Sequence, residues 1–211
     1  LKMYQDRLPA DAKRIPVVHV PKTIDNDYHV IDFTFGYFTA VETLASEIRN
    51  LLYDSEASNA YFIAETMGRS AGWLAYGAAI AGEASLVLSV EDITGEYLTQ
   101  ETVYDEQLKE TVTRDIMNLP AVIDRVVKMM VMREKEKKKF GVIVLAEGLA
   151  ELLPYEHIRG IGRDSHKHLR IADVVKRGFF STTGAFMRQL LKIETDRVRP
   201  APAATQVDRH G

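Results

Sequence analysis

The chain has 211 residues, of which 46% are hydrophobic and 27% are charged, a composition typical of globular domains. Its formal net charge of -3 creates no field that would attract nucleic acid or a membrane, so we expect neither as a partner. The sequence contains no cysteine, which excludes disulfides and thiolate metal sites. Because it also has no apolar run of signal-peptide or membrane-span length, we expect a cytoplasmic protein.

The periodicity of apolar residues predicts strands that alternate with helices. In chain order it predicts a strand at 15–20, a helix at 36–53, a strand at 60–65, a helix at 70–81, a strand at 84–90, a helix at about 115–138 and a strand at 141–146. Such alternation indicates right-handed crossovers and a mostly parallel sheet. The strands are apolar throughout, which is typical of an α/β fold with helices on both faces of the sheet.

Polar residues follow three of these strands, at the positions where ligands bind in this class of fold. Ligands of open α/β sheets bind in the crevice beyond the carboxyl ends of the strands. The three segments are PKTIDND at 21–27, TMGRSAG at 66–72 and EGLAE at 147–151. We therefore expect the functional side chains to lie in these segments.

The segment PKTIDND has the residue types that phosphoryl transfer needs. Asp25 could accept a proton from a sugar hydroxyl, and Asp27 could hold that geometry or reach a metal through water. Thr23 could bind a phosphoryl group, and the positive charge of Lys22 could stabilise a transferring phosphate. The alternative is a structural turn, because Asp-Asn-Asp favours tight turns through bonds from side chain to backbone.

The other two segments each have a functional and a structural interpretation. Gly68 allows a sharp turn or close approach to a ligand. Arg69 directly precedes Ser70, a candidate N-cap of the next helix, and an arginine there could bind a phosphate together with the helix N-terminus. Glu147 could accept hydrogen bonds from sugar hydroxyls. The alternatives are a surface arginine and a helix-capping or ion-paired glutamate.

Three further features carry weaker functional signals. His166 and His168 are two residues apart, but no third ligand follows, so we assign no metal ligands. The charged run at 133–139 suits the C-terminal end of a helix in solvent better than a nucleic-acid patch. The tail at 200–211 is rich in proline and alanine, and a disordered tail is expected there.

The order of these motifs resembles the phosphofructokinase family. PKTIDND is followed about forty residues later by ETMGRSAGW, and then by a strand and AEG, over a range from about Ile15 to Glu147. The segment between the first two motifs contains TFGYFTAVETLASEIRNLL, which also matches. The resemblance implies a Rossmann-like phosphofructokinase fold that is incomplete in this chain.

The resemblance also implies a reaction, in which a phosphoryl group passes to the 1-hydroxyl of fructose 6-phosphate, giving fructose 1,6-bisphosphate, with Mg²⁺ as cofactor. Asp25 would be the proton acceptor, and it would also line the sugar. Arg69 would contact the sugar phosphate and offset transition-state charge, and Glu147 would bond the fructose ring. The other substrate-binding positions that the resemblance assigns are Thr23, Ile24, Met67 and Gly68.

The phosphoryl donor is the finer expectation. Family members that use pyrophosphate carry a lysine at the position of Lys22, and so do some that use ATP. We expect pyrophosphate, because a lysine charge suits a small anion without a nucleoside. The alternatives are an ATP-dependent enzyme and a truncated, non-catalytic relic that binds the sugar phosphate.

The departures from the family pattern suggest a piece of a longer protein. The Gly-Gly-Asp phosphate loop that precedes PKTIDND in the family has no counterpart here, and after Glu147 the similarity weakens. We divide the chain into a remnant of the phosphoryl-donor domain at 1–35, a sugar-phosphate domain at 36–180 and a divergent tail at 181–211. When full length, the protein is expected to form a homo-oligomer, whereas this chain alone is expected to show little turnover.

Overall fold

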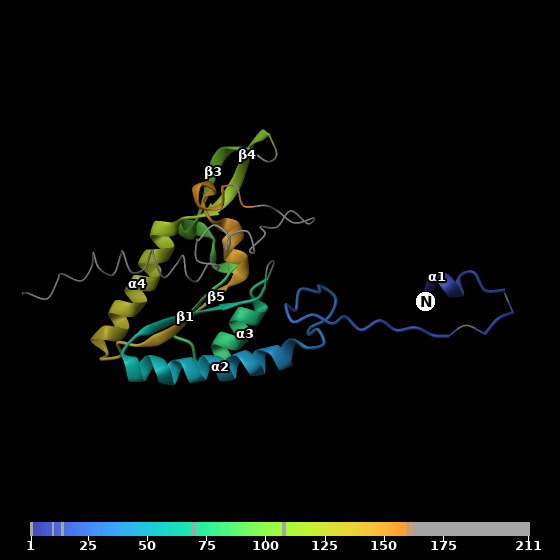
Figure 1. Ribbon diagram of the computed structural model, residues 1–211, viewed down its shortest axis with the longest axis horizontal. Coiled ribbons are helices and arrows are strands. Elements are labelled where there is room, and N and C mark those ends of the chain that lie inside the picture. Colours follow the sequence, from blue (N-terminus) through green and yellow to red (C-terminus); the bar gives the residue numbers. More distant parts are fainter. Residues whose placement is uncertain are drawn as a thin grey trace, which may run out of the picture.

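The computed structural model describes residues 2–9, 11–13, 15–68, 71–106, 109–159 and 161. Residues 37–159 form an α/β unit, and an N-terminal arm leads away from it, with a short helix, α1 (Lys2–Gln5), near its start (Figure 1). No helix in the described part of the chain is long and apolar enough to cross a bilayer.

A parallel three-stranded sheet forms the centre of this unit, in the order β1 (Tyr61–Thr66), β5 (Gly141–Ala146) and β2 (Leu86–Leu88). The register pairs Tyr61 with Gly141 and Thr66 with Ala146, so β1 and β5 end together. Every residue of β5 is buried, as predicted for a strand that has a neighbour on each side and helices on both faces.

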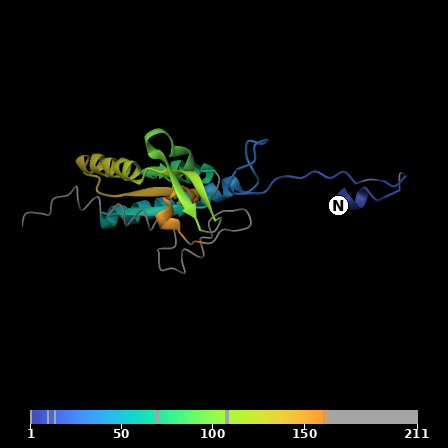
Figure 2. The same ribbon diagram turned by 90° about the horizontal axis from the view of Figure 1, so that it is seen from above.

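Helices cover both faces of the sheet, which confirms the predicted fold class. Helices α2 (Tyr37–Ser58) and α3 (Trp73–Ala81) pack against Val142, Val144 and Ala146. Helix α4 (Leu119–Lys135) packs on the opposite face, against Ile143 and Leu145. Figure 2 shows β5 as the layer between α4 and α2. Successive residues of a strand point to opposite faces, which explains why GVIVLA has no polar position.

An antiparallel hairpin lies between the predicted strand at 84–90 and the predicted helix at about 115–138, where no element was predicted. Strands β3 (Leu98–Asp105) and β4 (Glu110–Met117) pair along their whole length. The helix expected from about 115 therefore begins only at Leu119, where a proline in the first turn suits the N-terminus. Arg114 of β4 donates to the carbonyl oxygens of Glu151 and Leu153, at 2.7 and 2.8 Å, which holds the hairpin against the following segment.

That segment consists of two short helices, η3 (Glu147–Leu152) and α5 (Tyr155–Ile158). Two further short helices, η1 (Val90–Asp92) and η2 (Gly95–Tyr97), follow β2. Strand β2 is consequently shorter than the predicted strand at 84–90. The predicted disordered tail at 200–211 and the histidine pair lie outside the described residues.

The prediction of a strand at 15–20 is wrong for this structure. These residues are extended but belong to no strand, and their side chains are exposed, Val18 to 87%. The only bridge described near them joins Lys22 to Phe35. A strand exists only when another backbone supplies partners for its N–H and C=O groups, and the described residues place none beside 15–20.

Candidate functional site

The carboxyl ends of β1 and β5 bring two of the predicted site segments together. The backbone N–H of Gly148 donates to the carbonyl oxygen of Gly68 at 3.1 Å, two residues beyond the last paired residues of the two strands. Met67 and Gly68 therefore lie beside Glu147, which is half-buried. Both segments had been predicted to follow strands of a mostly parallel sheet, and the structure shows that they lie side by side.

Gly68 has a conformation that requires glycine. Its φ of +131° is rarely adopted by residues with a side chain, and a Cβ there would lie 2.7 Å from the carbonyl oxygen of Ala71. The backbone of Ala71 thus returns against Gly68. Arg69 and Ser70, which join these two residues in the sequence, lie outside the described residues.

The beginning of α3 differs from the expectation. The helix starts at Trp73 with Gly72 as its N-cap, so Ser70 is not the cap. The backbone N–H of Gly72 donates to Oε1 of Glu91 at 2.8 Å. A carboxylate therefore already occupies the first described N–H donor at this helix end, where a phosphate had been expected.

Glu91 belongs to η1, a segment that the sequence analysis did not assign to the site. Ser89 donates its hydroxyl to the other carboxylate oxygen of Glu91. The backbone N–H of Ser89 in turn donates to Asp92 at 2.9 Å, in a capping box. The pattern S-x-x-D after a strand could have revealed the capping box, but no local pattern indicates that Glu91 reaches Gly72.

Asp92 fixes η1 between two helices. It accepts a hydrogen bond from the hydroxyl of Tyr76 in α3, at 2.8 Å, and pairs with Arg125 of α4 at 3.5 Å. Burial, the hydrogen bond to Asp92 and its negative charge raise the pKa of Tyr76 above the usual tyrosine value. The position of Glu91 is thus set by contacts on both sides of the sheet.

The segment PKTIDND forms the first part of a loop that is closed at its base. The N–H of Phe35 donates to the carbonyl oxygen of Pro21 at 3.1 Å. The hydroxyl of Thr34 donates to the carbonyl oxygen of Thr23 at 2.6 Å, and its backbone N–H donates to the side chain of Asn26 at 2.8 Å. Asn26 has a positive φ of 54°. The turn interpretation therefore holds for Asn26, whose side chain organises the loop.

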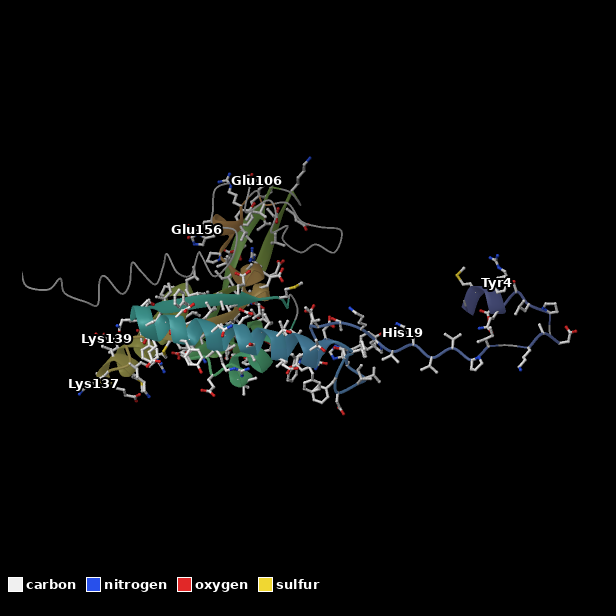
Figure 3. The ribbon with its side chains drawn as sticks, turned by 60° about the horizontal axis from the view of Figure 1, so that its bottom comes forward. Tyr4, His19, Glu106, Lys137, Lys139 and Glu156 are labelled. Carbon is white, nitrogen blue, oxygen red and sulfur yellow. The ribbon has the colours of Figure 1, made fainter. Side chains whose placement is uncertain are left out.

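The predicted site residues of this loop surround that turn. Asp25 is half-buried, and its backbone N–H donates to the hydroxyl of Thr23 at 3.1 Å. Ile24 is half-buried near Gly36, whereas Lys22 and Asp27 are exposed. Figures 1 and 3 show the loop beyond the N-terminal end of α2, at the end of the sheet where β1 finishes.

A family model described as Phosphofructokinase matches residues 3–189. The chain belongs to the phosphofructokinase family. The match includes the loop at 21–35, the ends of β1 and β5, and η1. All the residues of the candidate site therefore lie within the part of the chain that matches the family.

Relatives of this phosphofructokinase chain carry names with two different donors. It is 34% identical over 167 residues to the pyrophosphate–fructose 6-phosphate 1-phosphotransferase of Thermotoga maritima, covering 76% of this chain and 35% of that protein. It is 36% identical over 134 residues to an ATP-dependent 6-phosphofructokinase of Corynebacterium efficiens, covering 64% of this chain and 31% of that protein. The chain thus spans about a third of the length of these relatives.

Solved phosphofructokinases also resemble the structure at a low level. That of Pichia pastoris in the T-state has a TM-score of 0.46 and 18% identity, covering 65% of this chain and 13% of that chain. The pyrophosphate-dependent enzyme of Nitrosospira multiformis has a TM-score of 0.42 and 22% identity, covering 62% and 28%.

The described residues do not build a magnesium site of their own. Among them, no group of three or more His, Asp or Glu residues is arranged to hold a metal ion. Mg²⁺ is commonly bound through one or two carboxylates and the phosphates of a substrate, rather than by a cage of protein ligands. The described side chains therefore offer no basis for a step that passes through the metal.

Proposed function

We propose that the native protein that contains this chain transfers a phosphoryl group to the 1-hydroxyl of fructose 6-phosphate, giving fructose 1,6-bisphosphate. The observation that carries the proposal is the hydrogen bond between Gly148 and Gly68, which joins two motif segments at the carboxyl end of a parallel sheet. Sugar phosphates fit such a crevice, because ligands of open α/β sheets bind there. Membership of the phosphofructokinase family supports this substrate class.

The reaction assigns a role to the half-buried carboxylate of Asp25. The oxygen of the 1-hydroxyl attacks the terminal phosphorus of the donor, its proton passes to Asp25, and the bond from phosphorus to the donor's leaving oxygen breaks. Thr23 and Ile24 line the sugar and the transferring group. Lys22, which is exposed, would approach the leaving phosphate.

The acceptor sugar is held by the neighbouring segments. Met67, Gly68 and Arg69 contact the sugar phosphate, and the charge of Arg69 also offsets the charge that develops during transfer. Glu147 accepts hydrogen bonds from the fructose ring. Its place beside Gly68 supports a shared substrate surface on the two strand ends.

The proposed donor is pyrophosphate, with ATP as the alternative. Lys22 suits a small anion, whereas the names of the relatives include both donors and leave the choice open. Magnesium would come to the site with the donor phosphates. We also propose that the native protein is cytoplasmic and acts as a homo-oligomer, as the family resemblance implies.

Steady-state assays of the native protein with fructose 6-phosphate and each donor test the proposal. Asp25→Asn should lower kcat about 100- to 10,000-fold, because a positioned acid–base group contributes that much, while fructose 6-phosphate still binds. Asp32→Asn changes an exposed carboxylate of the same loop and should leave kcat near normal. Lys22→Ala should reduce turnover with pyrophosphate more than it weakens binding of the sugar phosphate.

Three outcomes would change this assignment. Near-normal turnover by Asp25→Asn would remove Asp25 from the role of base. A clear preference for ATP would reject the pyrophosphate donor. Binding of fructose 6-phosphate by the unmodified protein, without turnover by either donor, would favour a sugar-phosphate-binding relic.

A further inference from the structure

The loop between β1 and α3 has a hydrogen bond at each end, one between two backbone groups and one from the backbone to a side chain. At the start, the carbonyl oxygen of Gly68 accepts from Gly148 at 3.1 Å, and at the end the N–H of Gly72 donates to Glu91 at 2.8 Å. In the sequence, Arg69 and Ser70 lie between these two anchors. The backbone of Ala71, which precedes Gly72, lies against Gly68, so the two anchored ends meet.

Resting on the proposed function, we infer that Glu91 is a positioning residue. By holding Gly72 it keeps Ala71 against Gly68, so that Met67 and Gly68 can bind the sugar phosphate. Glu91 acts through Gly72 and does not itself touch the substrate. Its partner Ser89 donates to the second carboxylate oxygen and so orients the side chain for the bond to Gly72.

The close approach of η1 to the loop supports this inference. A Cβ on Gly72 would lie 1.7 Å from the hydroxyl oxygen of Ser89 and 2.7 Å from Oε2 of Glu91. Any side chain at position 72 would therefore push η1 and the loop apart. Glycine at this position allows the bond between Glu91 and the Gly72 N–H to form.

Contacts of the neighbouring residue hold Glu91 in place, although Glu91 itself is exposed. Its neighbour Asp92 is bonded to Tyr76 and paired with Arg125, so η1 cannot shift without breaking contacts to α3 and α4. A rigid support of this kind is what a binding site needs, because small displacements of binding groups weaken the interaction.

Two substitutions should release the anchor. In the native protein, Glu91→Ala removes the acceptor and Gly72→Ala separates the two partners. Each should raise KM for fructose 6-phosphate about three- to tenfold, the ordinary net value of one hydrogen bond, while KM for the donor stays unchanged and kcat changes less. Hydrogen–deuterium exchange at the Gly72 amide should become faster in Glu91→Ala.

Two further variants separate positioning from general destabilisation. Glu91→Gln keeps an oxygen that can accept from Gly72, and the Ser89 hydroxyl can turn to accept from the new amide, so it should restore KM and amide protection. Glu96→Ala removes an exposed glutamate from the next short helix, η2, and should behave like the unmodified protein.

The results distinguish failure of this inference from failure of the proposed function. If the unmodified protein does not bind fructose 6-phosphate, both the proposed function and the role of Glu91 are rejected. If it binds normally but Glu91→Ala shows the same KM, or raises KM for both substrates equally, the inference alone is overturned. Failure of Glu91→Gln to restore KM would also contradict a role through this hydrogen bond.

Discussion

Two apolar runs of equal length adopt different structures in this molecule, one a buried strand and the other an exposed, extended segment. GVIVLA at 141–146 becomes the central strand β5, with Val144 completely buried. IPVVHV at 15–20 stays extended and joins no strand of the described residues, with Val18 exposed to 87%. The difference shows that an apolar run is only a candidate for a strand.

The neighbours of the two runs explain this difference. Strand β5 pairs with β1 on one side and β2 on the other, and helices cover both of its faces. The run at 15–20 lies in the arm, where Figure 3 shows His19 well away from the α/β unit. The loop at 21–35 is intermediate in how well its backbone is held, because internal hydrogen bonds close it although it belongs to none of the described sheets.

The largest expected effect is the difference in unfolding free energy when the same substitution is made in each run. Val144→Ala should lower the free energy of unfolding by about 2–3 kcal/mol, because it removes two buried methyl groups and leaves a cavity. Val18→Ala should change it by less than about 0.5 kcal/mol, because the side chain is already in solvent. Urea unfolding followed by circular dichroism measures both. An equal loss in the two variants would mean that the arm is packed in solution.

Two glycines with a positive φ offer a second, smaller contrast. Gly68→Ala should cost about 2 kcal/mol, because its φ is positive and the new Cβ would meet Ala71. Gly95 also has a positive φ, of 56°, but a Cβ there would have no atom within 4 Å, so Gly95→Ala should cost only about 1 kcal/mol. Thermal unfolding tests this order, and calorimetry should show weaker binding of fructose 6-phosphate for Gly68→Ala alone.

We expect the smallest effect on stability from a substitution in the closed loop at 21–35. Thr34→Val keeps the shape of a side chain that is only 4% exposed but removes its hydroxyl, and should cost about 1 kcal/mol. The loop at 21–35 should also be cleaved faster by a protease. In helix α2, Thr43 makes a similar bond to Thr39 in an exposed position, so Thr43→Val is the matched control and should have little effect. Equal protease sensitivity in both variants would argue against closure by Thr34.

The elements of the α/β unit were largely predictable, but the hairpin was not. Periodicity identified α2, β1, α3, β2, α4 and β5, with errors at some ends, because long apolar faces leave a clear pattern. The two strands β3 and β4 have mostly polar outer positions, and their connection lacks the glycine or asparagine typical of tight hairpins. Lys109 takes the positive φ there instead. The domain boundaries at 35 and 180 stay predictions.

Sequence alone determined which residue types follow β1 and β5, and so predicted the site segments around Gly68 and Glu147. It also predicted the segment around Asp25, but from a strand that the structure does not form. These signals are local, since a motif and the strand before it are contiguous in the chain. Only the tertiary structure decided that 15–20 meets no partner strand among the described residues, that Gly148 bonds to Gly68, and that Glu91 reaches Gly72. Such contacts depend on the three-dimensional placement of residues far apart in the chain, and no local pattern encodes that placement.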